Sequence, residues 1–186
     1  MATDEDSQQE WTWLQQAAGG DETAFRSLVE RYQGRLMNFF LRHGVKDHAE
    51  DLVQETFMRL YRHRRHARPL ARFTTFIHTL AHHAWVDFVR KQNRRARLLA
   101  CFGRESTAID SQSAQCASDR IDAECLLQTL TPDHRAAVIL ILYQGLSHAE
   151  AAEALGIPVG TVKSRLHHAL HRMHNVLHAP KGIDHE

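Results

Sequence analysis

The chain has few residues of the kinds that kink or loosen a protein, and it has no long apolar run. Its 186 residues include only 4 prolines and 9 glycines, which excludes a collagen-like or low-complexity architecture. No stretch approaches the roughly 18 consecutive apolar residues of a membrane span. The acidic start, residues 1–6, lacks the apolar run of a secretory signal. We therefore expect a cytoplasmic protein with no direct membrane insertion.

Cysteine is also scarce. Cys101, Cys116 and Cys125 are odd in number and include no closely spaced pair. This pattern argues against a disulfide framework and against a four-thiolate zinc site. We expect three ordinary reduced thiols.

The net charge of +1 hides a strong separation of charge along the chain. Residues 1–58 hold 11 acidic and five basic side chains, residues 59–97 hold 11 basic side chains and one acid, and residues 156–181 hold four basic side chains and no acid. A solvated helix face usually carries mixed signs. The two basic segments are therefore candidate phosphate-binding surfaces, and the acidic segment implies a second kind of partner.

The apolar residues recur with helical period throughout, and no segment alternates with period two. Apolar side chains at three- and four-residue steps predict long helices from near Asp21, from Ala49 to Tyr61, and from Phe76 to Val89. The fold class that we predict is all-α, with two small helical domains joined by a flexible linker. The domains are residues 1–98 and 121–178, the linker is 99–120, where the apolar rhythm lapses, and 179–186 form a tail.

The second domain carries sharp helix boundaries. Thr131-Pro132 is typical of a helix start, and Ser147 with Glu150 matches a capping box. Gly156 ends the short helix that this box begins, and a last helix follows with an apolar stripe on one face and a basic, acid-free polar face. This arrangement predicts a helix-turn-helix, whose second helix enters the major groove of DNA.

Two motifs in this order resemble bacterial sigma factors. Residues 145–166, GLSHAEAAEALGIPVGTVKSRL, closely resemble their fourth region, and residues 49–61, AEDLVQETFMRLY, resemble their second region. The order, the short linker and the lack of a third domain resemble the extracytoplasmic-function (ECF) group. The resemblance implies a non-enzymatic subunit that directs core RNA polymerase to promoter DNA and assists its opening. It also implies an anti-sigma factor, in this group often membrane-anchored.

The resemblance implies a polymerase-binding helix face in the second region. Its members are Asp51, Gln54, Glu55 and Met58. They stand at i, i+3, i+4 and i+7, and so form one stripe opposite the apolar face of the helix. From the residues alone, a solvated helix face is the favoured interpretation.

The basic segment from Arg59 to Arg97 would bind and melt the minus-ten promoter element. The residues that we assign to it are Arg68, Arg72, His83, Arg90 and Lys91. Opening a duplex needs cations for the backbone and a pocket for an extruded base. The loop 67–72 is our candidate for that pocket, and spacing predicts that Phe76, Trp85 and Phe88 belong to the core. The family usually has Trp in place of Phe76 and often Asn in place of His83.

The last helix would read the minus-thirty-five element. The residues that we assign to it are Thr161, Lys163, Ser164, Arg165, His167 and His168. Lys163 and Arg165 could contact base edges or phosphates, while the hydroxyls of Thr161 and Ser164 could donate to phosphates.

The 15 histidines suggest metal ligands, but the surrounding residues do not. Several have helical ligand spacing, yet none has a Cys or carboxylate at a suitable spacing. We predict no metal and no cofactor, and expect these histidines to be solvated or to face phosphate. Two other functions stay open: a stand-alone helix-turn-helix regulator, which leaves the acidic stripe and the basic segment unused, and a histidine-based nuclease, which lacks paired carboxylates.

Overall fold

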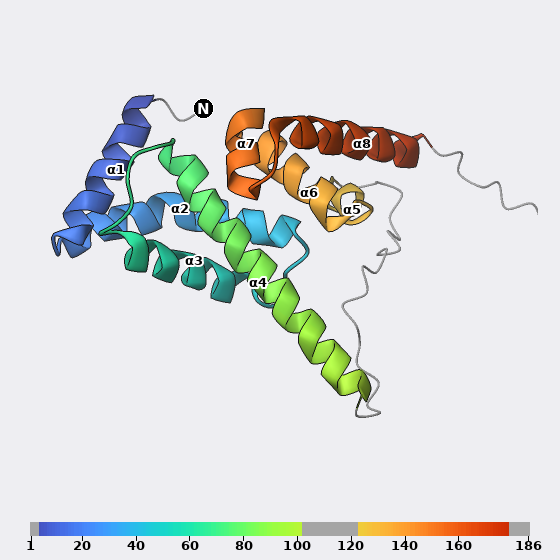
Figure 1. The fold of residues 1–186 in the computed structure, drawn as a ribbon, viewed down its shortest axis with the longest axis horizontal. Coiled ribbons are helices and arrows are strands. Elements are labelled where there is room, and N and C mark those ends of the chain that lie inside the picture. The colour runs from blue at the N-terminus through green and yellow to red at the C-terminus, as the bar shows by residue number, and fades with distance from the viewer. Residues whose placement is uncertain (1–3, 102–122, 179–186) are drawn as a thin grey trace, which may run out of the picture.

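The computed structural model describes residues 4–101 and 123–178, and these residues form helices without any strand (Figure 1). The all-α prediction is confirmed. We refer to α1–α4 as the N-terminal group and to α5–α8 as the C-terminal group. The elements are α1 (Asp4–Ala18), α2 (Glu22–Arg42), α3 (Ala49–His63), α4 (Phe73–Cys101), α5 (Ala123–Gln128), α6 (Pro132–Val138), the π-helical turn η1 (Ile139–Tyr143), α7 (His148–Leu155) and α8 (Val159–Leu177).

Helix α1 was not predicted from the sequence. Its buried apolar side chains are Trp11, Leu14 and Ala17. They form a narrow stripe at three-residue steps. The rest of the helix is polar, so the helical signal is weak. The helix is stable here because it packs on α2 and α4.

Helix α2 begins where the sequence predicts. The Asp21 side chain accepts hydrogen bonds from the backbone N–H groups of Thr23 and Ala24, as an N-cap residue does. Aromatic and aliphatic side chains of α2, α3 and α4 then form the core of the N-terminal group, with Tyr32 and Phe73 fully buried.

The helix boundaries predicted in the C-terminal group are present. Thr131 caps α6, with Pro132 at the first helical position. Both hydrogen bonds of the predicted capping box join Ser147 and Glu150, and Gly156 adopts φ +66° at the end of α7. Because that conformation strains residues with a Cβ, Gly156 permits the tight turn between α7 and α8.

Two sequence predictions, the end of the first domain and the state of the cysteines, differ from the structure. Helix α4 continues to Cys101, past the predicted boundary at residue 98, and most of the predicted linker and the tail lie outside the described residues. Cys125 is disulfide-bonded, so the expectation of three reduced thiols is wrong for this residue. Sequence spacing does not show which cysteines a fold brings within bonding distance.

The two helix groups pack against each other, with α7 lying along α4 (Figure 1). Their apolar residues form one continuous buried cluster. None of the helices in residues 4–101 and 123–178 combines the length and the apolar character needed to span a bilayer.

Candidate nucleic-acid interface

The predicted acidic stripe lies on the outer face of α3. Asp51, Gln54 and Met58 are exposed, and 45% of Met58 is accessible to solvent, which is high for a large apolar side chain. Glu55 is half-buried because its carboxylate accepts from the Arg59 guanidinium at 2.8 Å. The stripe therefore presents one paired and one exposed carboxylate, an amide and an apolar side chain to a partner.

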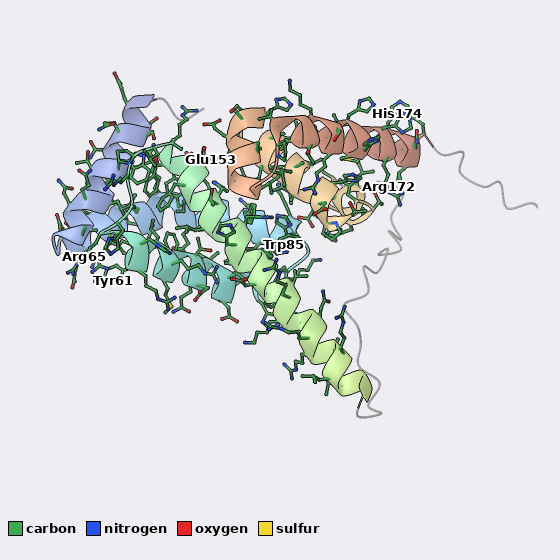
Figure 2. The ribbon with its side chains drawn as sticks, viewed as in Figure 1. Tyr61, Arg65, Trp85, Glu153, Arg172 and His174 are labelled. Atoms are coloured by element: carbon green, nitrogen blue, oxygen red, sulfur yellow. The ribbon has the colours of Figure 1, made fainter. Side chains whose placement is uncertain are left out.

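The loop between α3 and α4, residues 64–72, lines a cavity of about 350 Å³. Its walls include Arg68, Leu70 and Ala71 from the loop, Phe76 from α4, and Glu153 from α7. Figure 2 shows Glu153 on the side of α7 that faces α4. The predicted loop thus does form a concave surface, of the size that ligand pockets generally have.

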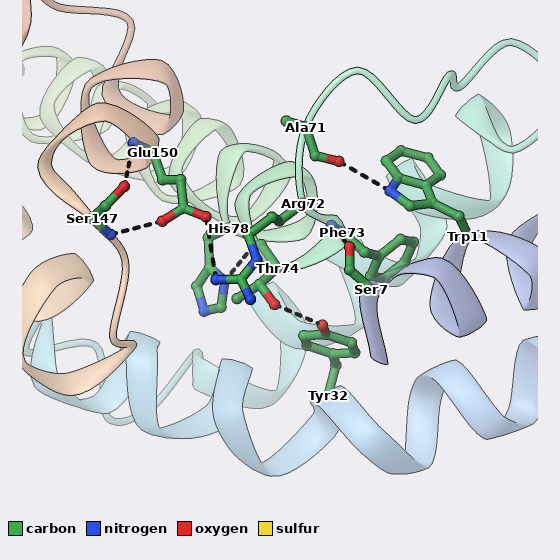
Figure 3. A network of polar contacts seen from close by, with 10 residues as sticks. All are labelled: Ser7, Trp11, Tyr32, Ala71, Arg72, Phe73, Thr74, His78, Ser147 and Glu150. Carbon is green, nitrogen blue, oxygen red and sulfur yellow. Dashed lines mark hydrogen bonds and ion pairs between the residues drawn. The ribbon is translucent and has the colours of Figure 1, made fainter. Parts of the chain in front are cut away.

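Helix α1 supports this loop from below (Figure 3). The Trp11 indole N–H donates to the Ala71 carbonyl at 3.0 Å, and Ser7 Oγ accepts from the Phe73 backbone N–H at 2.9 Å. The Trp11 ring also lies 5.2 Å from the rings of both Phe73 and Phe76. Sequence reasoning missed these supporting residues, for which only the tryptophan in an otherwise polar segment gave a signal.

The other residues assigned to the minus-ten surface lie along α4. His83 and Arg90 line a second cavity of about 490 Å³, together with Arg59, Asp87 and α7 residue Leu155. Lys91 is exposed beside Arg90. The structure thus brings His83 and Arg90 together but places them on a different hollow from the loop residue Arg68.

Two arginines of the basic segment are already engaged within the protein. Arg59 pairs with Glu55 and, at 2.9 Å, with Asp87. Arg64 donates to the Tyr61 carbonyl, and its guanidinium lies over the Tyr61 ring. Figure 2 shows Tyr61 and Arg65 at the far end of α3, where both are exposed. Any phosphate contact by Arg59 or Arg64, which belong to the same basic segment, therefore requires that these internal contacts be exchanged.

The aromatic residues of α4 are mainly structural. Phe73 is fully buried and Trp85 is 7% exposed, while Phe76 and Phe88 pack against the core. The prediction that Phe76, Trp85 and Phe88 belong to the core agrees with the burial of Trp85 and with the partial burial of Phe76 and Phe88 against it.

Helix α8 presents the residues that the sequence assigns to the minus-thirty-five element. Val162 and Ala169 bury the apolar face. The opposite side is exposed at Lys163, Ser164, His167 and His168, whereas Thr161 and Arg165 are half-buried. The Ser164 hydroxyl donates to the Thr161 carbonyl at 3.0 Å, which leaves its oxygen as an acceptor. Because the capping box and Gly156 set the angle of α7 to α8, this polar face projects away from the C-terminal core.

Arg165 is not free in this structure. Its guanidinium donates to Asp133 of α6 at 2.9 Å, and 24% of its side chain is exposed. A base contact by Arg165 would have to replace this ion pair, which is accessible to water on the Asp133 side.

Among the described residues, polar contacts that join the two helix groups include the following four. The Arg72 guanidinium lies 3.7 Å from the Glu150 carboxylate, and the His78 ring nitrogen lies 3.1 Å from the Gln144 side-chain oxygen. The first of these contacts lies where α4 and α7 begin (Figure 3).

The remaining two contacts lie at the C-terminal end of α2. The buried Arg135 guanidinium donates to the His43 carbonyl at 3.0 Å and to three carbonyls of its own group, and the Arg42 guanidinium lies 3.8 Å from the centre of the Tyr143 ring. A cation at the carbonyl end of a helix also interacts favourably with the helix dipole. Arg135 therefore caps a helix of the other group.

His43 and His78 are buried at or near this contact and His82 is half-buried, so the prediction that the histidines of the basic segments are solvated or face phosphate is wrong for His78 and His82. Burial lowers the pKa of His43 well below its ordinary value, and it also lowers the pKa of His78. Burial lowers the pKa of His82 to about 4. All three are therefore neutral at pH 7. In the described residues, no group of three or more His, Cys, Asp or Glu side chains is arranged to hold a metal ion.

Comparisons with known proteins identify both halves of the chain. The family model for Sigma-70 region 2 matches residues 28–95, and the model for region 4 of the same family matches residues 120–173. These ranges contain the α3 stripe, the loop, α4 and the helix-turn-helix.

Individual relatives extend the match over most of the chain. RNA polymerase sigma factor CarQ of Myxococcus xanthus is 34% identical over 167 residues, which cover 85% of this chain and 91% of CarQ. ECF RNA polymerase sigma factor SigE of Mycolicibacterium smegmatis is 33% identical over 168 residues, and the match covers 86% of this chain but only 65% of SigE, a longer protein.

A solved structure agrees with these matches. The sigma factor RpoE of Bartonella quintana, in complex with the anti-sigma factor NepR, superposes with a TM-score of 0.68 at 30% identity, over 84% of this chain and 98% of that one. Since both sigma-70 regions are present in order, and the relatives exceed 30% identity over most of their length, the chain belongs to the ECF group of bacterial RNA polymerase sigma factors.

Proposed function

We propose that this protein binds core RNA polymerase in the cytoplasm, directs it to a set of promoters and assists promoter opening, without enzymatic activity of its own. The observation that carries the proposal is that one chain holds an exposed acidic stripe on α3 and a helix-turn-helix at α7 and α8. A stand-alone regulator would have no use for the first of these surfaces.

The α3 stripe is the proposed polymerase-binding surface. Asp51, Gln54 and Met58 are exposed together, and the pairing of Glu55 with Arg59 holds that carboxylate in place on the same face. The centre of a protein interface is commonly apolar and poor in charged residues, and polar residues surround it at the rim. Met58 is suited to be that anchor.

The loop 64–72 and the first turns of α4 are the proposed minus-ten surface. Arg68 would hold the DNA backbone at the mouth of the 350 Å³ cavity, while Phe76 offers an apolar wall to an unstacked base. His83, Arg90 and Lys91 would contact the strand farther along α4. Arg72 would join them once released from Glu150.

Helix α8 is the proposed minus-thirty-five reader. Lys163 and Arg165 would contact bases or phosphates in the major groove, and Thr161 would donate to phosphate, as would Ser164 once its hydroxyl is released from the Thr161 carbonyl. His167 and His168 extend the same exposed face by one turn. The two DNA surfaces reinforce each other when both are held on polymerase, because each raises the effective concentration of the other.

We also propose an anti-sigma factor as the controlling partner. The related RpoE is held by such a factor in its solved structure. Here Leu170 and Leu177 of α8 are 44% and 49% exposed, which leaves an apolar strip of one helix open to a partner.

Reconstitution with core polymerase tests the proposal. Purified chain should co-elute with core polymerase and direct transcription from a defined set of starts when genomic DNA of the source organism is the template. Arg68→Ala should reduce permanganate-reactive promoter opening without changing co-elution. A chain that binds promoter DNA but never co-elutes with polymerase would instead be a stand-alone regulator.

A further inference from the structure

The surface proposed for the minus-ten element is covered by the chain itself. Helix α7 packs against α4 (Figure 1), and its residues Glu153 and Leu155 line the two hollows of that surface. Resting on the function proposed above, we propose that α7 is an internal competitor of promoter DNA: in the free chain it binds the minus-ten surface and must leave before DNA can enter.

Most of the residues assigned to DNA lie at surfaces that α7 also lines. Glu150 lies 3.7 Å from Arg72, and Glu153 shares the 350 Å³ cavity with Arg68. Leu155 shares the 490 Å³ cavity with His83 and Arg90. Four of the five assigned residues thus face α7, and Lys91 is the exception.

Helix α7 and DNA can bind this surface through the same kind of group. Both put negatively charged oxygens beside arginine guanidinium groups. Although burial raises the pKa of Glu150, hydrogen bonds with Ser147 and the charge of Arg72 outweigh that effect and lower it, so the carboxylate is ionised at neutral pH. Glu150 and DNA phosphate therefore cannot both occupy the position beside Arg72.

Anchors outside the DNA surface hold α7 in place. Arg135 caps the end of α2, and Arg42 lies over the Tyr143 ring. None of these contacts uses a residue assigned to DNA. We call the arrangement in which α7 packs on α4 the closed form. The anchors that hold the closed form are different residues from those that it covers, as a masking contact requires.

The polymerase-binding stripe stays accessible while the DNA surface is covered. Figure 1 shows α3 and α7 on opposite sides of α4, and Asp51, Gln54 and Met58 are exposed. The closed chain can therefore dock on polymerase before it opens, which would keep the free protein from binding DNA unproductively.

Charge-neutral variants of α7 test the competition directly. In the full chain, Glu150→Gln with Glu153→Gln removes both carboxylates, and Gln at residue 150 can still complete the capping box. The probe is a fluorescent single-stranded 20-mer of mixed sequence, and its anisotropy is measured without polymerase. The matched control is Glu30→Gln with Glu124→Gln, the same change of charge at exposed sites on α2 and α5.

The α7 variant should bind the oligonucleotide about three- to tenfold more tightly than the control variant, as expected from loss of one partly exposed ion pair and of a second carboxylate at the cavity wall. Adding Arg68→Ala to it should remove most of this gain. An affinity gain no larger than that of the control would overturn the inference. The proposed function is judged separately, by the effect of Arg68→Ala on promoter opening in the reconstituted holoenzyme.

Discussion

Acidification should separate the two helix groups, because two buried histidines and one half-buried histidine, all neutral at pH 7, lie at or near their contact. His43 and His78 lose nearly all contact with solvent in the closed chain, with 4% and 0% of each residue exposed, and one ring nitrogen of His82 is buried without a partner. When the groups separate, these rings gain access to water and to protons. The open form therefore binds more protons than the closed form.

The charged groups around the three rings reinforce this direction, with one exception. His43 faces His82 and Arg135, His78 faces Arg35, and both arginines oppose protonation. His82 faces His83 and Arg165, which lower its pKa, and Asp133, which raises it. Burial remains the largest cause for every one of them.

The size of the effect follows from His82, whose pKa is about 4 in the closed chain against an ordinary 6.5. Between pH 7.5 and 5.5 a solvated imidazole takes up its proton and the buried one does not. That difference weakens the contact by about 1.4 kcal/mol, or about tenfold in the ratio of closed to open chain. His43 and His78 act in the same direction, so the closed form is lost progressively below about pH 6.5.

Small-angle X-ray scattering of the full chain measures the separation. The radius of gyration should rise between pH 7.5 and 5.5, while far-ultraviolet circular dichroism stays unchanged because the helices remain. His82→Gln cannot titrate and should shift the midpoint of expansion to lower pH. His174→Gln, at an exposed position on α8, is the control and should behave as the parent chain does. Expansion that is identical in the His82→Gln chain, or no expansion at all, would refute the reasoning.

Three further predictions concern the surfaces themselves. Asp51→Lys with Glu55→Lys should abolish co-elution with core polymerase while circular dichroism stays normal, because neither side chain belongs to the core; unchanged co-elution would remove the stripe from the interface. Arg165→Ala should cost about 1–3 kcal/mol of promoter binding at one base position, measured with a panel of upstream-element variants, and an even loss across the panel would indicate a phosphate contact instead. Trp11→Phe removes the hydrogen bond to Ala71 but keeps a ring, so it should lower the free energy of unfolding in urea by about 1 kcal/mol and weaken promoter opening, whereas opening at the parent rate would show that the loop does not need this support.

Local signals in the sequence predict the parts of this fold that depend on neighbouring residues. The N-cap at Asp21, the capping box of Ser147 and Glu150, and the turn at Gly156 are each determined within four residues, and each is present. The stripe of α3 follows from the helical repeat in the same way. Helix α1 was missed because its stability comes from packing on α2 and α4.

The contacts that cover the candidate site could not be predicted by the same reasoning. His78 and Gln144 are 66 residues apart, and Arg135 and His43 are 92 residues apart. No periodicity or motif links such pairs. The environments of His78 and His82 could not be predicted for the same reason: in the sequence both stand in the basic segment, whereas in the fold they lie at or near the contact with the second group.

The closed contact and the proposed promoter contact place opposite demands on the same arginines. A tighter ion pair between Arg72 and Glu150 would protect the free chain but would oppose DNA entry after polymerase has bound. The observed pair is suited to release, since its atoms are 3.7 Å apart and its side chains are 37% and 19% exposed, so water screens the attraction. The strongly buried anchor is Arg135, which lies away from the DNA surface. Because polymerase docking on α3 does not require the closed contact to break, the free energy of opening can be offset on the polymerase, where both DNA surfaces act at high effective concentration.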